Sequence, residues 1–232
     1  MEKLLIIDGL NLHFQMFFGM PSRIINTNGK AIHGTLGFVG AFIKIMKMTN
    51  PTHIVVLFDG EHPNDRAELL GEYKANRIDY SIVPEEESPF SQLQDVMNIK
   101  HTEVEEVETD DVIASYTHTY GNEVEIVIAS FDSDFFQLIS DNVKVLRYRG
   151  NNTVVCDTEY IKNKYGISPY QYADFKSLTG DNSDNIRGAE KVGPKTASSL
   201  LNQFGSLHKI INNADKIQKP SIQESIIRNT DR

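Results

Sequence analysis

Nine carboxylates in this sequence have the type and the spacing to do chemistry. They are Asp8, Asp59, Glu108, Asp110, Asp111, Asp132, Asp134, Asp181 and Asp184. Carboxylates gathered in one pocket repel one another and raise each other's pKa, and hard cations remove that repulsion. Oxygen ligands without paired His or Cys suit Mg²⁺ or Mn²⁺ rather than Zn²⁺. Two such ions about 3.5–4 Å apart stabilise both oxygens of an in-line phosphoryl displacement, so the set predicts phosphoryl-transfer chemistry.

Helix capping is the alternative explanation for each close group of acids. Asp is a common N-cap and suits the positive end of the helix dipole. We expect one group to begin a helix at 108–111 and another to open a helix at 181–184. Capping does not explain acids that follow three different strands, so the metal-site interpretation is favoured for the set as a whole.

Three apolar runs predict the strands that position these acids. The runs cover residues 3–7, 54–58 and 124–129, and they are followed by Asp8, by Asp59 and by the pair Asp132 and Asp134. Strands alternating with helical patterns at 34–48 and 110–120 predict an α/β fold with a mainly parallel central sheet. Sites in such sheets lie at the carboxyl ends of the strands, so the acids are expected to meet in one pocket.

The remaining pattern divides the chain into an α/β part and a helical part. Residues 143–147 and 153–156 flank Gly150-Asn151-Asn152 and predict a hairpin. From Thr158 onward no further strand is evident and the chain is expected to be helical. We therefore predict an α/β catalytic domain over 1–157 and a helical region over 158–232.

Composition limits the classes of protein that this chain could be. The 232 residues are 40% hydrophobic, which is enough for a substantial core, and the net charge is −9. An acidic chain argues against nucleic acid as a partner. Binding of nucleic acid depends on where the charges lie and not on the net charge alone, however, and bound divalent cations invert the local field around their carboxylate ligands.

The apolar segments and the cysteine content indicate the cellular compartment of the protein. No apolar stretch approaches the ~18 residues of a membrane span, and the first apolar run is too short for a signal peptide. The single Cys156 has no partner for an intramolecular disulfide or a Cys-rich zinc site. We expect a cytoplasmic protein that does not contact a membrane, and we default to a monomer.

The order of the motifs resembles the bacterial and phage flap endonucleases, or 5′-to-3′ exonucleases, and equally the 5′-nuclease domain of DNA polymerase I. The resemblance runs from about residue 4 to residue 205. It is carried by Leu-Ile-Ile-Asp-Gly ending at Gly9, Phe58-Asp59-Gly60, Arg66, Glu72-Tyr73-Lys74-Ala75-Asn76-Arg77, Glu108-Thr109-Asp110-Asp111-Val112-Ile113, Asp132-Ser133-Asp134 and Thr179-Gly180-Asp181-Asn182-Ser183-Asp184-Asn185-Ile186.

The resemblance implies a PIN-like nuclease fold, with a helical arch at about 74–100 and a C-terminal helix-hairpin-helix region. It implies hydrolysis of DNA at the single-strand/duplex junctions of 5′ flaps, in DNA replication and repair, by a two-metal-ion mechanism. The first metal site would be formed mainly by Asp8, Asp59, Glu108, Asp110 and Asp132. The second would be formed mainly by Asp134, Asp181 and Asp184, with Asp111 in support.

Four residues near the arch are candidate substrate contacts. Lys74 and Arg77 match the cations at the arch base and would hold the scissile phosphate. Arg66 is interpreted either as a phosphate contact or as a partner of Glu68 or Glu72. Tyr73 is interpreted either as a residue that stacks on a base or as a core residue.

The segment 188–197 resembles the family's hairpin, within a motif expected at about 185–205. Glycines permit its tight turn, and backbone N–H groups at a helix start bind phosphate without reading sequence. The resemblance assigns DNA binding here to Gly188, Lys191, Gly193, Lys195 and Thr196, with a K⁺ site at the hairpin. Lys191 stands where the family usually has a glycine, and lysine tolerates a positive φ poorly, which puts the K⁺ site in question.

Two alternative functions remain open from the sequence. One is a PIN-type ribonuclease, although small PIN ribonucleases usually lack the arch and the hairpin. The other is a non-catalytic protein that binds DNA junctions, which the complete set of acids disfavours. The chain ends sooner than the resemblance implies, which would fit a truncation, a polymerase fused beyond residue 232 or a polymerase encoded elsewhere.

Overall fold

The computed structural model describes residues 2–20, 23–29, 31–59, 99–104 and 107–229. The described residues fall into two compact units, one that ends at Asp157 and one that begins at Thr158. The arch expected at about 74–100 lies, apart from 99–100, outside the described residues. Among the described helices, none combines the length and the apolar character needed to span a bilayer.

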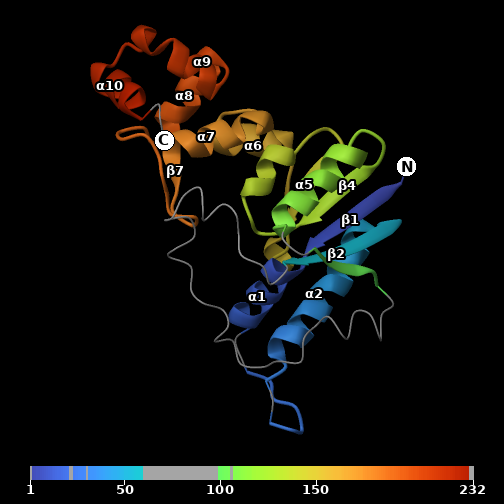
Figure 1. Cartoon of the computed structure of the whole chain (residues 1–232). Coiled ribbons are helices and arrows are strands. Elements are labelled where there is room, and N and C mark those ends of the chain that lie inside the picture. Colours follow the sequence, from blue (N-terminus) through green and yellow to red (C-terminus); the bar gives the residue numbers. More distant parts are fainter. Residues whose placement is uncertain (1, 21–22, 30, 60–98, 105–106, 230–232) are drawn as a thin grey trace. The chain divides into compact units, whose positions relative to one another are not determined.

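The first unit alternates strands with helices, as the sequence predicts (Figure 1). Its described elements are β1 (Lys3–Asp8), α1 (Gly9–Gly19), α2 (His33–Thr49), β2 (His53–Asp59), β3 (His101–Val104), α5 (Thr109–Tyr120), β4 (Glu125–Ala129), η2 (Asp134–Leu138), β5 (Val143–Arg147), η3 (Gly150–Asn152) and β6 (Val154–Cys156). The three strands expected from apolar runs are confirmed as β1, β2 and β4. The helices expected at 34–48 and 110–120 are confirmed as α2 and α5.

These strands form one sheet with the order β3-β2-β1-β4-β5-β6. All neighbouring strands are parallel except β5 and β6, which form the expected antiparallel hairpin. β1 lies between β2 and β4, with Asp8 in register with Leu57 and Ile7 in register with Ala129. Parallel strands bring their carboxyl ends to the same edge, so Asp8, Asp59 and the segment after β4 share that edge of the sheet.

Apolar side chains on one face of the sheet anchor β1. Leu5 and Ile7 are fully buried in a cluster with Phe38 and Phe42 of α2, while Ile6 is equally buried and points to the opposite face. Figure 1 shows α1 and α2 side by side against the strands. A strand that is buried on both faces holds its last residue, Asp8, in a rigid position.

Gly9 permits the close approach of α1 to the sheet. A Cβ atom at this position would lie 2.3–2.6 Å from ring atoms of Phe58 on β2. The glycine that directly follows Asp8 is therefore required for packing, and it allows α1 to begin at the end of β1.

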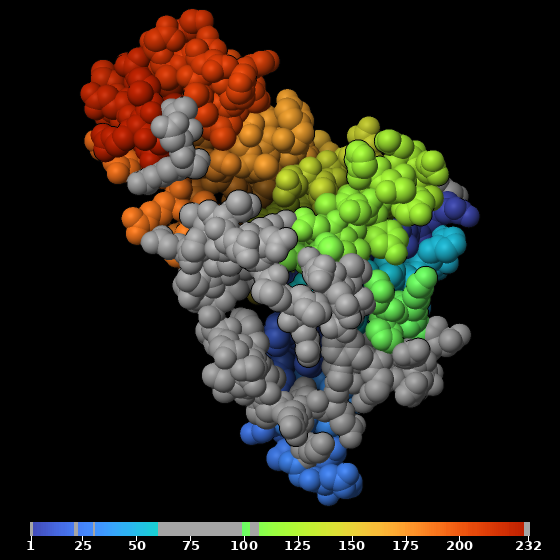
Figure 2. All heavy atoms as spheres, in the orientation of Figure 1, coloured from blue at the N-terminus to red at the C-terminus, as the bar shows by residue number. Residues whose placement is uncertain are grey.

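The second unit is mainly helical and contains one small hairpin. Its described elements are α6 (Thr158–Tyr165), η4 (Pro169–Gln171), α7 (Tyr172–Thr179), β7 (Gly180–Asp181), β8 (Ile186–Arg187), α8 (Pro194–Phe204), α9 (Leu207–Asn212), η5 (Ala214–Lys216) and α10 (Pro220–Arg228). Figure 2 shows the side chains of the last helices, in red, gathered in one body. Leu201 of α8, Ile210 of α9 and Ile226 of α10 are buried there.

Two expectations for this unit are wrong. The chain after Thr158 does contain strands, because β7 and β8 pair antiparallel. The segment 181–184 does not open a helix, since Asp181 ends β7 and residues 182–185 form the turn that joins these two strands. Gly180 at φ 81 and Asn185 at φ 59 allow the chain to reverse direction there, because both residue types tolerate the left-handed region.

Candidate metal centre

Asp8 receives hydrogen bonds on both of its carboxylate oxygens. Its Oδ1 accepts from the backbone N–H of Asn11 at 3.2 Å, as the N-cap of α1. Its Oδ2 accepts from the hydroxyl of Ser130 at 2.7 Å. The side chain is therefore oriented from both sides at the carboxyl edge of the sheet, and it is only 7% exposed.

The environment of Asp8 disfavours its charged form. Burial raises the pKa of Asp8 from 3.8 to about 7, although the hydrogen bonds from Ser130 and Asn11 oppose the shift. The negative charges of Asp59 and Asp132 raise the pKa further, which also shows that these three predicted ligands share one electrostatic environment. A divalent cation among them would favour the ionised form of all three.

Asp59 connects the end of β2 to the start of α5. Its Oδ1 accepts the backbone N–H of Thr109 at 2.8 Å, although 50 residues separate the two in sequence. Glu108 is the N-cap of α5, and Asp110 and Asp111 lie in the first turn. The structure thus brings this predicted group to the same edge as Asp59; Glu108 and Asp110 are half-buried, while Asp111 is exposed.

The segment after β4 carries Asp132 and Asp134. Asp132 accepts the backbone N–H of Asp134 at 2.9 Å, and its own N–H donates to Ser130 Oγ at 3.0 Å. Arg147 holds this segment from β5, because its Nη2 donates to the carbonyl of Phe131 at 2.7 Å. The same guanidinium lies 4.6 Å from the centre of the Phe136 ring. A cation therefore supports the loop backbone directly before Asp132.

We expect the raised pKa of Asp8 to make the metal-free protein less stable as the pH rises from about 4 to about 7. In this window the folded chain keeps a proton on Asp8 that the unfolded chain has already lost. The stabilisation is fully present below the unfolded pKa and is lost as the pH passes the folded pKa. A shift of this size corresponds to a few kcal/mol, on the order of 4 at most.

Urea unfolding in EDTA at pH 5 and pH 8, of the wild type and of Asp8→Asn, measures this contribution. The wild type should lose stability relative to the variant at the higher pH, and Mg²⁺ should raise the wild-type melting temperature more at pH 8 than at pH 5. A wild-type-minus-variant difference that does not change with pH would contradict the assignment.

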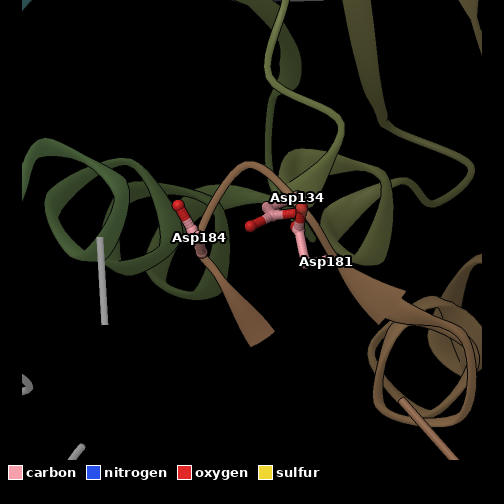
Figure 3. A group of neighbouring side chains, drawn as sticks. All are labelled: Asp134, Asp181 and Asp184. Atoms are coloured by element: carbon pink, nitrogen blue, oxygen red, sulfur yellow. The ribbon is translucent and has the colours of Figure 1, made fainter. Parts of the chain in front are cut away.

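In the second unit, Asp181 and Asp184 project from the β7–β8 turn (Figure 3), and both are 8% exposed. Ser183 donates its backbone N–H to Asp181 Oδ1 at 2.9 Å and also donates its hydroxyl to this oxygen. Lys176 of α7 forms an ion pair with Oδ2 of the same residue. Burial tends to raise the pKa of Asp181, but the hydrogen bonds from Lys176 and Ser183 outweigh it and lower the pKa below its usual value. Asp181 is therefore ionised in the neutral range.

The hairpin region of the second unit places its predicted DNA contacts near the start of α8. Gly193 is the N-cap of this helix, no side chain of the described residues caps it, and Gly193 and Lys195 are exposed while Thr196 is half-buried. Gly188 has a packing role of its own, because an added Cβ would lie 2.3 Å from Gly180 N.

Lys191 has a positive φ of 62, a backbone conformation that lysine tolerates poorly. It is the third residue of a turn closed by the Val192 N–H and the Ala189 carbonyl at 3.1 Å, a turn family in which positive φ favours glycine. The left-handed region costs a non-glycine residue roughly 1–2 kcal/mol. We expect Lys191→Gly to stabilise the protein by about 0.5–1 kcal/mol after the greater freedom of glycine in the unfolded chain is subtracted.

Denaturant unfolding of Lys191→Gly beside Lys191→Ala tests this backbone effect. Lys191→Ala removes the same charge but keeps the backbone strain, so the stability of this variant should stay near that of the wild type. A stability gain in alanine equal to that in glycine would assign the effect to the charge instead.

Four predicted substrate contacts, Arg66, Tyr73, Lys74 and Arg77, lie outside the described residues, as does Gly60 of the second motif. The sequence interpretation also missed three residues that support the described carboxylates: Asn11, Ser130 and Arg147. Asn11 follows Asp8 by three residues at a helix start, and Ser130 is a polar residue directly after an apolar strand. These two positions were visible signals, whereas Arg147 is identified only by the fold.

The residues present fit hard divalent cations. The donors at the first unit's edge are carboxylate oxygens, the type of ligand that Mg²⁺ and Mn²⁺ prefer. Asp8 is a buried acid whose burial and acidic neighbours make its ionised form costly, and a bound cation would remove that cost.

Comparisons with known proteins identify one family over residues 3–232. Residues 3–166 match the family model "5'-3' exonuclease, N-terminal resolvase-like domain", and residues 167–232 match "5'-3' exonuclease, C-terminal SAM fold". A 5'-3' exonuclease of Buchnera aphidicola is 34% identical over 222 residues, which cover 94% of this chain and 76% of that protein.

Longer relatives and solved structures match as well. The thermostable DNA polymerase I of Thermus aquaticus is 33% identical over 231 residues, which cover 99% of this chain and 27% of the polymerase. The chain thus spans about a quarter of the length of such relatives. The T5 D15 protein, co-crystallised with metal ions, superimposes with a TM-score of 0.78 at 23% identity over 99% of this chain and 85% of that chain. This likeness shows the fold, a PIN-type domain followed by a SAM-like region.

Proposed function

Because the chain belongs to the 5′-3′ exonuclease family, whose members are metal-dependent nucleases, we propose that it hydrolyses DNA phosphodiesters at 5′ flaps and 5′ ends. The observation that carries the proposal is the edge of the first unit's sheet. Carboxylates from the ends of β1 and β2 and from the segment after β4 meet there. Burial and the neighbouring negative charges make the ionised form of Asp8 costly, and a bound cation would remove that cost.

Two divalent ions, Mg²⁺ or Mn²⁺, would supply positive charge to the attacking and leaving oxygens of an in-line displacement. We propose that Asp8, Asp59, Glu108, Asp110 and Asp132 hold the first ion. Asp134, Asp181 and Asp184 would hold the second, with Asp111 in support. Lys176 already pairs with Asp181, so its ammonium would remain beside the second ion or give up that oxygen to it.

Positive side chains would hold the DNA backbone on either side of the scissile bond. We assign the scissile phosphate to Lys74 and Arg77, and further backbone or base contacts to Arg66 and Tyr73, on the strength of the motif match alone. Removing one well-placed donor of this kind costs about 3 kcal/mol in the transition state.

The helical C-terminal part would hold the duplex without reading its sequence. Residues 158–232 carry 11 Lys and Arg against 8 Asp and Glu, although the whole chain has a net charge of −9. The N-terminus of α8, with exposed Gly193 and Lys195, offers N–H groups and a cation to phosphate. We propose that Gly188, Lys191 and Thr196 complete this surface, and that a K⁺ ion binds at the hairpin in spite of Lys191.

A substrate panel tests the proposal. A 5′-flap DNA, a nicked duplex, a single-stranded DNA and a single-stranded RNA of one sequence are compared in Mg²⁺ and Mn²⁺. The flap and nicked duplexes should be cut and the RNA left intact, and the ratio of flap-length fragments to mononucleotides reports the balance of endonuclease and exonuclease. Preferential cutting of RNA would establish a ribonuclease, and tight binding of the flap without cutting in either metal would establish a junction-binding protein.

The setting of this activity is part of the same proposal. A monomer in the cytoplasm, acting in replication and repair, fits a chain with one buried cysteine. Gel filtration with light scattering would test the monomeric state.

A further inference from the structure

Ser130 joins two predicted metal ligands that come from neighbouring strands. Its side chain lies directly after β4 and is 3% exposed. The hydroxyl donates to Asp8 Oδ2 at 2.7 Å and accepts the backbone N–H of Asp132 at 3.0 Å. One oxygen atom therefore connects the carboxylate at the end of β1 with the backbone that carries the next carboxylate.

Asn11 forms a second connection between Asp8 and the segment after β4. Its backbone N–H donates to Asp8 Oδ1 at 3.2 Å, and its side-chain Oδ1 accepts the backbone N–H of Phe131 at 2.9 Å. Four hydrogen bonds thus link the start of α1, Asp8 and the segment after β4. Both oxygens of Asp8 are fixed in direction while each keeps acceptor capacity for a cation.

We propose that Ser130 is a positioning residue, assisted by Asn11, which fixes the carboxylate of Asp8 and the backbone of Asp132 so that the first site binds its divalent cation tightly. The inference rests on the proposed function only in taking Asp8 and Asp132 as ligands. The hydroxyl of Ser130 bonds to the carboxylate of Asp8 and to the backbone of Asp132, and it would act through these two acids.

The chemistry of the position requires a hydroxyl. A hydroxyl can donate one hydrogen bond and accept others, and Ser130 uses both capacities. Alanine would remove the donor to Asp8 and leave the N–H of Asp132 without this acceptor. Threonine would keep both. Residues that orient metal ligands in this way typically contribute about 10–100-fold to metal affinity.

Calorimetric titration of metal-free protein with Mn²⁺ measures the contribution of Ser130 without any cleavage assay. We compare the wild type with Ser130→Ala, Ser130→Thr and Ser140→Ala, the last being an exposed serine of the same unit. Ser130→Ala should weaken the tighter Mn²⁺ site by about 10-fold or more, while Ser130→Thr and Ser140→Ala stay within about 2-fold of the wild type. Thermal unfolding in EDTA shows whether each variant is folded.

The nuclease assay separates positioning from general damage. In Ser130→Ala the concentration of Mn²⁺ at half-maximal rate should rise with the dissociation constant, while the rate at saturating metal should recover most of the wild-type value. Asn11→Ala keeps its backbone N–H and should show a smaller shift in the same direction.

Unchanged Mn²⁺ affinity in folded Ser130→Ala would overturn the proposal, and so would an equal loss in the alanine and threonine variants. If the wild type binds Mn²⁺ in a Ser130-dependent manner but cuts no DNA, the positioning role stands and the proposed nuclease activity fails. If the wild type cuts DNA while Ser130→Ala binds Mn²⁺ as tightly as the wild type, the nuclease activity stands and the positioning role fails. A wild type that binds no Mn²⁺ would contradict both.

Discussion

Asp8→Asn is expected to lower the rate of 5′-flap cleavage by about 10³-fold or more while it makes the metal-free protein more stable at pH 8. Asparagine keeps the shape of the side chain but supplies no charge to a divalent cation. A bound cation stabilises the transition state by several kcal/mol, so removing one of its ligands accounts for a loss of rate of this size. Cleavage by purified protein at saturating Mg²⁺ measures the loss, and DNA affinity in EDTA should be nearly unchanged.

The gain in stability has the same origin as the loss of activity. Ionised Asp8 is buried beside Asp59 and Asp132, and this environment raises its pKa to about 7. A neutral amide avoids that cost at pH 8. Asp141→Asn is the matched control, since Asp141 is exposed in the same unit, and it should change neither activity nor stability. A variant at Asp8 that cuts flap DNA at the wild-type rate would remove Asp8 from the metal centre.

Asp134→Asn and Asp184→Asn are the second pair of changes with large expected effects. If these two acids hold a second ion, each change should lower the cleavage rate by about 10²–10³-fold, since one well-placed electrostatic contact is worth that much. Calorimetry with Mn²⁺ should lose the weaker binding event and keep the one that depends on Asp8. Asp215→Asn, at an exposed acid of the second unit, is the control for a change of net charge.

The result that contradicts the two-metal assignment is equally concrete. If both variants keep wild-type cleavage at millimolar Mg²⁺, the second ion is not required and one metal site performs the reaction. If cleavage is lost but the Mn²⁺ stoichiometry is unchanged, Asp134 and Asp184 act on the DNA instead of on an ion.

The sequence predicted the sheet edge well because two signals coincide there. Apolar runs mark β1, β2 and β4, and an acid follows each of them. Parallel pairing then brings the acids together without any further information. The hydrogen-bond network that orients the acids is less visible, because Ser130 and Arg147 carry ordinary residue types whose partners are distant in sequence.

Other elements were missed for identifiable reasons. β3 is four residues long at the edge of the sheet, and only Val104 in it is apolar, so it shows neither an apolar run nor an alternation of polar and apolar residues. α1 begins with a glycine, a residue that is unfavourable within a helix, and the packing of that glycine against Phe58 explains the exception.

The turn at 181–184 shows how one pattern can specify two structures. An Asp followed by polar residues is equally typical of a helix N-cap and of a turn in which the side chain binds backbone N–H groups. Here Asp181 accepts the N–H of Ser183, two residues on, and Gly180 at φ 81 starts the reversal. The surrounding turn holds Lys191 at a positive φ, which costs free energy locally. In the sequence, the only sign of this strain was a lysine where the family usually has glycine.

The most direct test of the central claim is cleavage of a 5′-flap DNA that carries a label at its 5′ end, with wild type and Asp8→Asn, first in Mg²⁺ and then with excess EDTA. The account predicts a labelled fragment of about flap length, or shorter products from the 5′ end, from the wild type in Mg²⁺ only. Asp8→Asn should leave the label at full length. Cleavage that persists in EDTA, or that is the same in Asp8→Asn as in the wild type, would contradict a metal-dependent reaction at this edge of the sheet.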